Sequence, residues 1–299
     1  MKLGFYTACF PELTLTEITG FAANEGFKTL EVACWPKGAA DRKGGGICHI
    51  DVETFNQNMA NEIKQNLKEK GLTISALSYY ANNLENDPEK RKFHHSHLKK
   101  IINAASMLEV PLVGTFAGKD PQKSLPENLK EFQDVFLELL DYARPHQVKI
   151  MIENCPAFST YPVSQNLAYS PEMWEQMFVL IPDEYLGLNF DPSHLFWQGI
   201  DIAKAIRGFT RRIFQVHAKD VEILTEVLSR VGIFGKGWWR NRLPGLGEIK
   251  WGSLLSTLYE VGYEGPVTIE HEDPIWEKTT EKAKKGLLLG KRHLDQFMA

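Results

Sequence analysis

Acidic residues and one histidine recur at matching places in this sequence, each at the end of a short apolar run. These run ends read Ile152-Glu153-Asn154, Phe190-Asp191-Pro192, Val216-His217-Ala218 and Ile269-Glu270-His271. Three carboxylates and an imidazole form a hard set of oxygen and nitrogen donors, which suits Mn²⁺, Mg²⁺ or Co²⁺ better than a thiolate-bound ion. Any one acid alone could be a buried ion-pair partner, but four matching positions favour a shared ion. We therefore predict one divalent ion, with Mn²⁺ as first choice and Mg²⁺, Co²⁺ or Zn²⁺ as alternatives.

Such a metal shell suits the removal of a proton next to a carbonyl group. The proton is lost only if negative charge on the developing enediolate oxygen is stabilised, which a metal ion can do. Two carboxylates, one on each side of the substrate, could remove the proton from one face and return it on the other, which is epimerisation. One base that returns the proton to the neighbouring carbon gives isomerisation, and expulsion of a β-hydroxyl gives dehydration. The four ligands alone leave these outcomes open.

The elements that must position these residues alternate between strands and helices. Short runs rich in β-branched and aromatic residues predict eight strands, at 3–8, 28–33, 73–78, 112–117, 149–154, 186–191, 213–218 and 267–272. Helical apolar spacing predicts helices near 14–25, 52–70, 88–109, 126–145, 171–180, 201–207, 251–261 and 276–297. Eight such units in this order predict a single α/β domain over residues 1–299, a (β/α)8 TIM barrel. Catalytic side chains of this fold project from the carboxyl ends of the strands, where adjacent strands lie roughly 4.8 Å apart.

One segment does not fit the simple repeat. Residues 220–250 are too many for a plain loop between a strand and a helix, and they predict an excursion over the carboxyl face of the barrel. The rival architecture, a doubly wound dinucleotide-binding sheet, should carry G-x-G-x-x-G directly after its first strand. The first strand here leads into TACFPEL instead, which disfavours that fold.

Composition limits the classes of partner. The chain has 299 residues, of which 43% are hydrophobic and 24% charged, and a formal net charge of −4, so it can bury a large core but has no overall basic character. Nucleic acids and anionic membranes are disfavoured, and a small-molecule partner is favoured. Four cysteines without a CxxC pair, and no apolar stretch long enough for a signal peptide or membrane span, predict a cytoplasmic protein.

Five motifs carry a specific resemblance: IENCP, NFDPSHLFWQGID, QVHAKD, RLPGLGEIKW and VTIEHED, in this order. They resemble the sugar phosphate isomerase/epimerase superfamily, the xylose isomerase-like TIM barrels that include ketose 3-epimerases and inosose dehydratases. The resemblance implies that Glu153, Asp191, His217 and Glu270 bind the metal and that the two glutamates also exchange the substrate proton. It also implies a substrate contact for His194. The predicted function is therefore a metal-dependent epimerase or isomerase of a sugar or polyol, with an inosose-type dehydratase as the alternative.

Other residues near strand ends are candidates for substrate binding. Lys219 has the same strand parity as His217 and is predicted either to contact substrate or to be solvated. Glu31 could bind a sugar hydroxyl or support the site, and Trp35 could wall a carbohydrate pocket. Arg240 and Arg242 could grip an anionic substrate group, or could serve a contact between copies of the chain in a homo-oligomer.

The residue types at the strand ends disfavour two further classes of function. The apurinic endonuclease IV barrel is a relative that needs extra histidines at the ends of the early strands. Here those ends read EVACW, ALSYY and TFAGK, without a histidine, and the net charge disfavours DNA. A non-catalytic barrel that only binds a sugar or a partner protein would tolerate loss of either glutamate. Both glutamates are present, which favours catalysis.

Overall fold

The fold is built on eight parallel strands that close into a barrel. The computed structural model describes residues 1–38, 45–156 and 165–298. The barrel strands follow the order β1-β10-β7-β6-β5-β4-β3-β2. Their bounds are β1 Lys2–Tyr6, β2 Thr29–Ala33, β3 Thr73–Ser78, β4 Leu112–Thr115, β5 Lys149–Glu153, β6 Leu186–Phe190, β7 Ile213–Ala218 and β10 Pro266–Ile269. Each predicted strand is present, and the predicted TIM barrel is confirmed.

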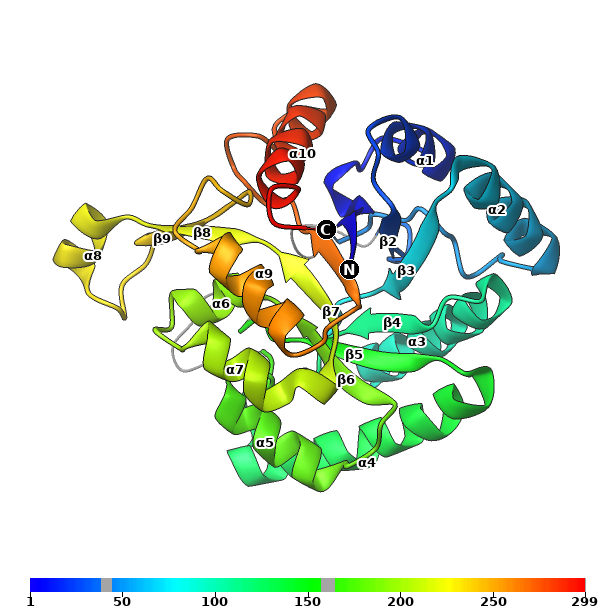
Figure 1. Cartoon of the computed structure of the whole chain (residues 1–299). Coiled ribbons are helices and arrows are strands. Elements are labelled where there is room, and N and C mark those ends of the chain that lie inside the picture. The colour runs from blue at the N-terminus through cyan, green and yellow to red at the C-terminus, as the bar shows by residue number, and fades with distance from the viewer. Residues whose placement is uncertain (39–44, 157–164, 299) are drawn as a thin grey trace.

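Helices surround the strands (Figure 1). They are α1 Leu15–Asn24, α2 Gln57–Lys70, α3 Pro88–Leu108, α4 Leu125–Ala143, α5 Pro171–Leu180, α6 Pro192–Phe196, α7 Ile202–Phe209, α8 Thr225–Val231, α9 Trp251–Glu260 and α10 Thr280–Leu294. Short 3-10 turns occur at Thr7–Cys9, Arg144–His146 and Thr210–Arg212. In the described ranges no helix is both long and apolar enough to span a membrane.

Local sequence signals explain where the elements begin and how closely they pack. Thr14 caps α1 with a complete capping box that includes Glu17, and Ser170 accepts a hydrogen bond from Met173 N at the start of α5.

A glycine allows two barrel strands to lie close together. A β-carbon on Gly4 would lie 2.1 Å from the carbonyl oxygen of Thr29. Only glycine therefore lets β1 approach β2 as closely as this barrel requires.

The segment 220–250 contains regular structure that its sequence did not predict. Strands β8 Asp220–Ile223 and β9 Trp239–Arg242 form an antiparallel pair, with α8 between them. This arm projects from the barrel (Figure 1, yellow). The Asp220 carboxylate anchors its return to the barrel, because it accepts hydrogen bonds from Gly245 N, Ile249 N and Trp251 Nε1. The two strands have four residues each and are separated by α8, and Glu222 on β8 pairs with Arg240 and Arg242 on β9.

Candidate metal centre at the carboxyl ends of the strands

The four predicted ligands lie together at the carboxyl end of the barrel. Glu153 ends β5, His217 lies near the end of β7, and Asp191 and Glu270 directly follow β6 and β10. These strands are neighbours in the barrel, and all four side chains are buried. One donor atom from each side chain lies within 4.8 Å of the others. The spacing therefore allows a single ion to contact all four.

A buried carboxylate on β2 fixes the orientation of His217. Glu31 Oε2 lies 2.6 Å from His217 Nε2 and also accepts a hydrogen bond from Gln215 Nε2 at 2.6 Å, while Tyr80 donates to Glu31 Oε1 at 2.5 Å. The other ring nitrogen, His217 Nδ1, lies 3.1 Å from Glu270 Oε2. A carboxylate behind a histidine ring is the usual way to present the opposite nitrogen to a metal. Glu31 therefore supports the site from behind His217.

The two carboxylate oxygens of Asp191 have different roles, since one caps a helix and the other faces the candidate metal position. Oδ1 accepts a hydrogen bond from Ser193 N at 2.8 Å and so caps α6. The Asn154 side chain donates to the Asp191 carbonyl at 2.9 Å and accepts from Asp191 N at 2.6 Å. This double hydrogen bond joins the end of β5 to the end of β6 and leaves Asp191 Oδ2 directed toward the other ligands.

The donor atoms fit a divalent ion. Glu153 Oε1 and His217 Nδ1 are buried and lie 3.5 Å apart, and His217 Nδ1 is within ion-pair distance of Glu270, but neither atom forms a hydrogen bond of regular geometry with a described residue. Buried polar atoms are rarely left so, because an unmade hydrogen bond costs free energy. Three carboxylates and one imidazole at this spacing match the oxygen and nitrogen donors that such ions bind.

Lys219 lies among the same carboxylates and is not solvated. Its Nζ is 2.7 Å from Glu270 Oε2, 2.9 Å from Asp191 Oδ2 and 3.2 Å from Glu272 Oε2. Burial alone would lower the pKa of Lys219, but the carboxylates of Asp191 and Glu270 raise it well above its usual value, so the side chain is positively charged. Lys219 thus balances the buried negative charge, and Glu272 gives it a partner outside the four ligands.

Replacement of Lys219 by methionine should destabilise the metal-free protein. The change leaves buried carboxylates without their counter-charge, and we expect the free energy of unfolding to fall by about 3 kcal/mol. Added Mn²⁺ should reduce this loss because it supplies positive charge to the same oxygens. Urea unfolding in EDTA and in saturating Mn²⁺ measures the free energy of unfolding without and with the ion. The control is Lys278→Met, because Lys278 lines the adjacent cavity. An equal loss in both conditions would contradict this role.

The two glutamates differ in their affinity for protons. Burial and the charge of Glu270 raise the pKa of Glu153 to about 7. Burial alone would also raise the pKa of Glu270, but the positive charges of Lys219 and His217 hold it well below its usual value. Near neutral pH, Glu153 can therefore give or accept a proton, while Glu270 stays an anion. Two titratable groups with such different environments are typical of an acid and base pair.

A cavity of about 480 Å³ opens over Glu153 and Glu270. Its wall includes Tyr6, Trp35 and Tyr80, so aromatic surface faces the carboxylates. This volume lies within the range of small-molecule sites. A second cavity, of about 630 Å³, lies among residues that begin strands, such as Lys2, Thr73 and Leu112. Active sites of TIM barrels lie at the opposite end, which favours the cavity over the two glutamates.

The remaining predicted site residues lie at different distances from this centre. His194, in α6, is buried, with Nε2 3.3 Å from Asp191 Oδ2, and burial lowers its pKa to about 4, so its ring is neutral. Both arginines lie on β9 of the arm and pair with carboxylates. Arg240 Nε lies 2.8 Å from Glu222 Oε2, and Arg242 pairs with Glu222 and lies 2.8 Å from Asp273 Oδ2. Within the described residues, neither arginine lines the cavity.

Several supporting residues were not found from the sequence. Gln215 donates a hydrogen bond to Glu31, and Asn154 is joined to Asp191 by two hydrogen bonds. The strand parity of Gln215 with His217 and the position of Asn154 next to Glu153 were the only signals for them in the sequence. Cys155 follows Glu153 by two residues, and its thiol lies beside Glu153 and His194. The IENCP motif contains this cysteine, but the number and spacing of the cysteines bear only on disulfides.

Comparison with known proteins places this geometry in a family. A family model described as "Xylose isomerase-like TIM barrel" matches residues 20–293. The uncharacterized protein YfiH of Bacillus subtilis is 28% identical, with 91% of this chain and 93% of that protein covered. The inosose isomerase of Bacillus subtilis is 28% identical over 71% of this chain and 70% of its own length. An inosose dehydratase of Clostridium botulinum is 35% identical, but over 36% of this chain and 38% of the relative.

Solved structures agree on the fold. The structure of the IOLI protein with a binding zinc atom has a TM-score of 0.75 and 20% identity, with 100% of both chains covered. The D-psicose 3-epimerase of Clostridium cellulolyticum H10, solved with D-tagatose, has a TM-score of 0.73 and 16% identity, with 99% of both chains covered. The family match and the closed eight-stranded barrel together show that the chain belongs to the xylose isomerase-like TIM barrels.

Proposed function

We propose that this protein is a divalent-metal-dependent isomerase or epimerase of a sugar or polyol. The observation that carries the proposal is the pair of glutamates, one with a pKa of about 7 and one anionic, beside a four-donor cluster and a cavity of about 480 Å³. Similarity to inosose isomerases supports the substrate class.

Glu153, Asp191, His217 and Glu270 would hold the ion. When bound there, a divalent ion would polarise the substrate carbonyl and stabilise negative charge on its oxygen. Mn²⁺ suits three carboxylates and one imidazole, and Zn²⁺ is the alternative that the zinc-containing IOLI structure supports.

The two glutamates would move the proton. Glu270, held as an anion by Lys219, accepts the proton from the carbon next to the carbonyl. On the other side of the substrate, Glu153 would return a proton to the enediolate form. The two carboxylates approach within 4.8 Å, so both can serve one bound sugar. Trp35 and Tyr6 would pack against its apolar face and exclude water.

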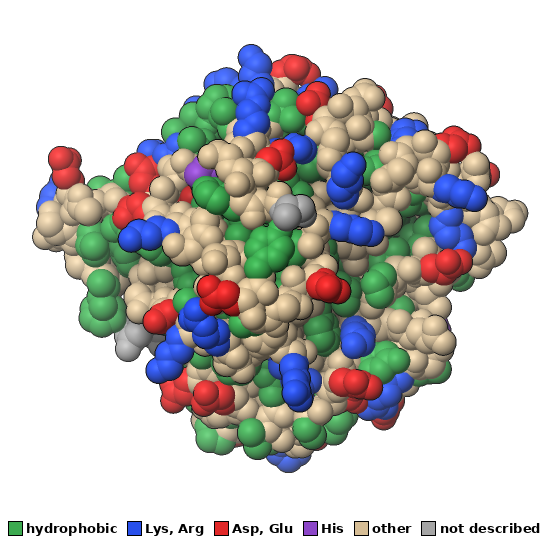
Figure 2. All heavy atoms as spheres, viewed as in Figure 1, with side chains coloured by type: hydrophobic (Ala, Val, Ile, Leu, Met, Phe, Trp, Pro, Cys, Tyr) green, Lys and Arg blue, Asp and Glu red, His purple; other side chains and the backbone are tan. Residues whose placement is uncertain are grey.

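The face of the molecule shown in Figure 2 supports a small-molecule substrate rather than a polyanion. On the face shown in Figure 2, Lys and Arg side chains are interspersed with Asp and Glu among the described residues. Nucleic-acid binding depends instead on a concentration of basic side chains.

Dehydration of an inosose is the second candidate. The local similarity to an inosose dehydratase favours it, and Glu153 could protonate a departing hydroxyl as readily as a carbon. The two reactions share the first proton removal and differ in the product, which for dehydration is lighter by one water.

The test is metal analysis of the purified protein, followed by NMR of deuterium uptake from D2O. The substrate panel should contain ketoses, including D-tagatose and D-psicose, inososes, and their phosphates. We expect bound divalent metal and exchange at the carbon next to the carbonyl, with mass spectrometry to separate rearrangement from loss of water. Absence of both metal and exchange would refute the proposal.

Binding of Mn²⁺ should release protons and become tighter as pH rises from about 6 to about 8, since metal ligands must be deprotonated. Burial alone would lower the pKa of His217, but Glu31 and Glu270 raise it well above its usual value, and the pKa of Glu153 is about 7. Both groups therefore carry protons below neutral pH, which the ion must displace. Calorimetric titration with MnCl2 in two buffers of different ionisation enthalpy measures the release. A pH-independent affinity would contradict it.

A further inference from the structure

Two cysteines lie opposite each other beside the cavity at the carboxyl end of the barrel. Cys34 directly follows β2, and Cys48 is its partner in an isolated antiparallel bridge. Both are thiols, of which Cys34 is buried and Cys48 is half-buried. Their chain neighbours Trp35 and Ile47 line the cavity. The bridge therefore joins two parts of the cavity wall.

The hydrogen bonds of this bridge place the two cysteine side chains close together. Trp35 N donates to the carbonyl oxygen of Ile47 at 3.2 Å. His49 N donates to the carbonyl oxygen of Ala33 at 2.9 Å. These bonds flank the two cysteines, which are therefore a non-hydrogen-bonded pair, with Cα atoms about 4.5 Å apart and side chains on the same side. A disulfide needs Cα atoms about 4.4–6.8 Å apart, so the backbone already has a suitable spacing.

Both cysteines are also held by contacts outside the bridge. On one side, His97 Nε2 lies 2.8 Å from the carbonyl oxygen of Cys34. On the other side, His49 directly follows Cys48, and its Nδ1 lies 2.9 Å from Thr7 Oγ1. The two backbones are thus fixed independently of each other, and a bond between the sulfur atoms requires movement mainly of the side chains.

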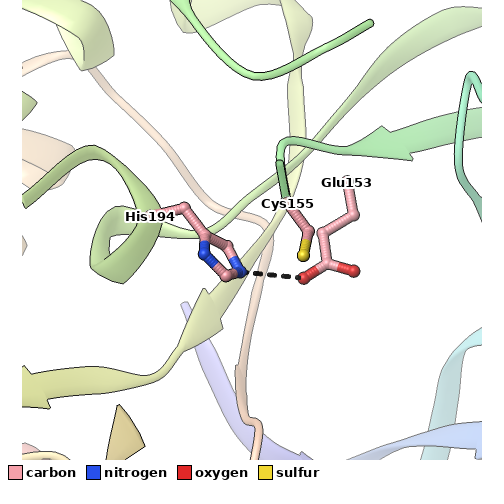
Figure 3. A group of neighbouring side chains, drawn as sticks. All are labelled: Glu153, Cys155 and His194. Carbon is pink, nitrogen blue, oxygen red and sulfur yellow. Dashed lines mark ion pairs between the residues drawn. The ribbon is translucent and has the colours of Figure 1, made fainter. Parts of the chain in front are cut away.

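The other two cysteines have different neighbours. Cys9 Sγ donates to the carbonyl oxygen of Tyr6 at 3.4 Å. Figure 3 shows the Cys155 sulfur directed into the space between Glu153 and His194. Within the described ranges, neither of these two cysteines lies opposite another cysteine in an isolated bridge.

We propose that Cys34 and Cys48 form a reversible disulfide, a covalent modification site that fixes this wall of the cavity when the thiols are oxidised. The bond would hold Ile47 against the end of β2, beside Trp35, and so would oppose opening of the bridge. The proposal depends neither on a metal ion nor on the proposed proton transfer.

The disulfide would form by two exchange steps with a small-molecule disulfide such as oxidised glutathione. The half-buried Cys48 reacts first, because its thiolate can attack one sulfur of the small disulfide, which releases one small thiol and leaves a mixed disulfide. The Cys34 thiolate then attacks the Cys48 sulfur and releases the second small thiol. The protein loses two hydrogen atoms, and the small disulfide is reduced to two thiols. Burial raises the pKa of both cysteines, so little thiolate is present at neutral pH and the reaction should be slow.

Prolonged incubation of the purified protein in mixtures of oxidised and reduced glutathione tests the bond. After the remaining thiols are alkylated, peptide mass spectrometry should find Cys34 joined to Cys48, and dithiothreitol should reverse the change. Cys48→Ser should abolish the joined peptide, whereas the matched control Cys9→Ser should retain it. Separate Cys34 and Cys48 peptides at every glutathione ratio, or a bond to another cysteine, would overturn the proposal.

Hydrogen–deuterium exchange tests the effect on the cavity wall. The amides of Trp35 and His49 are hydrogen-bonded across the bridge, so they exchange when the bridge opens. Oxidation should slow the exchange of both amides at least several-fold in the unaltered protein and leave it unchanged in Cys48→Ser. Equal exchange with and without the disulfide would contradict fixation of the wall. Neither measurement uses a substrate, so an absence of sugar turnover would count against the proposed function alone.

Discussion

Glu270→Gln should lower epimerisation or isomerisation by at least about 10³-fold, because it removes the carboxylate that accepts the substrate proton. Glu153→Gln should cause a loss of similar size through the opposite step, delivery of the proton. If both carboxylates act on an epimer pair, each single variant should retain slow deuterium exchange on one face without inversion. NMR in D2O, with the substrate that the exchange screen identifies, measures inversion and exchange in one experiment.

Glu277→Gln is the control, because Glu277 lines the same cavity but is not among the four clustered donors. Its rate should stay within a few-fold of the unaltered protein. Metal content must be measured in every variant, since Glu153 and Glu270 are also proposed ligands. Full activity in both glutamine variants would refute the two-base scheme, and loss in only one would favour a single base.

Glu31→Gln should weaken Mn²⁺ binding by about 10- to 100-fold, the usual cost of losing a carboxylate behind a metal-binding histidine. Glutamine keeps the shape but loses the charge that holds the His217 ring, whose Nε2 lies 2.6 Å from Glu31 Oε2. The metal-free protein should also lose about 3 kcal/mol of unfolding free energy, because one partner of a buried ion pair is removed. Calorimetry with MnCl2 and urea unfolding in EDTA measure the two effects.

Tyr80→Phe provides the comparison. It removes one hydrogen bond to Glu31 Oε1 but leaves the contact between Glu31 and His217 intact. Its effect on Mn²⁺ affinity should therefore be several-fold smaller. Equal effects of the two variants would mean that Glu31 acts through general packing of the barrel interior and does not position His217.

The barrel and the grouping of Glu153, Asp191, His217 and Glu270 could be predicted because both follow from local pattern. Each strand is a short apolar run, and in a parallel barrel the strand ends meet at one face. The arm formed by β8, α8 and β9 could not be predicted in the same way. Its four-residue strands are separated along the chain by α8, and Asp220 holds the returning chain at Gly245 and Ile249 through contacts that no local pattern contains.

The roles of Lys219 and Glu31 depended on contacts that no local pattern contains. Strand parity pointed Lys219 inward but could not show that four carboxylates surround its ammonium group. Glu31 and His217 are separated by 186 residues, and closure of the barrel brings them within hydrogen-bond distance.

By itself the sequence determined the strands, their order and the residue types at their ends, because periodicity and capping act over a few residues. The tertiary structure decided which partners those residues meet and therefore which charges they carry. Glu153 and Glu270 are the same residue type at equivalent strand ends, yet Lys219 and His217 hold the pKa of Glu270 low, while burial and Glu270 raise that of Glu153. That difference arises because burial strengthens every charge interaction, and only the folded barrel sets the distances between them.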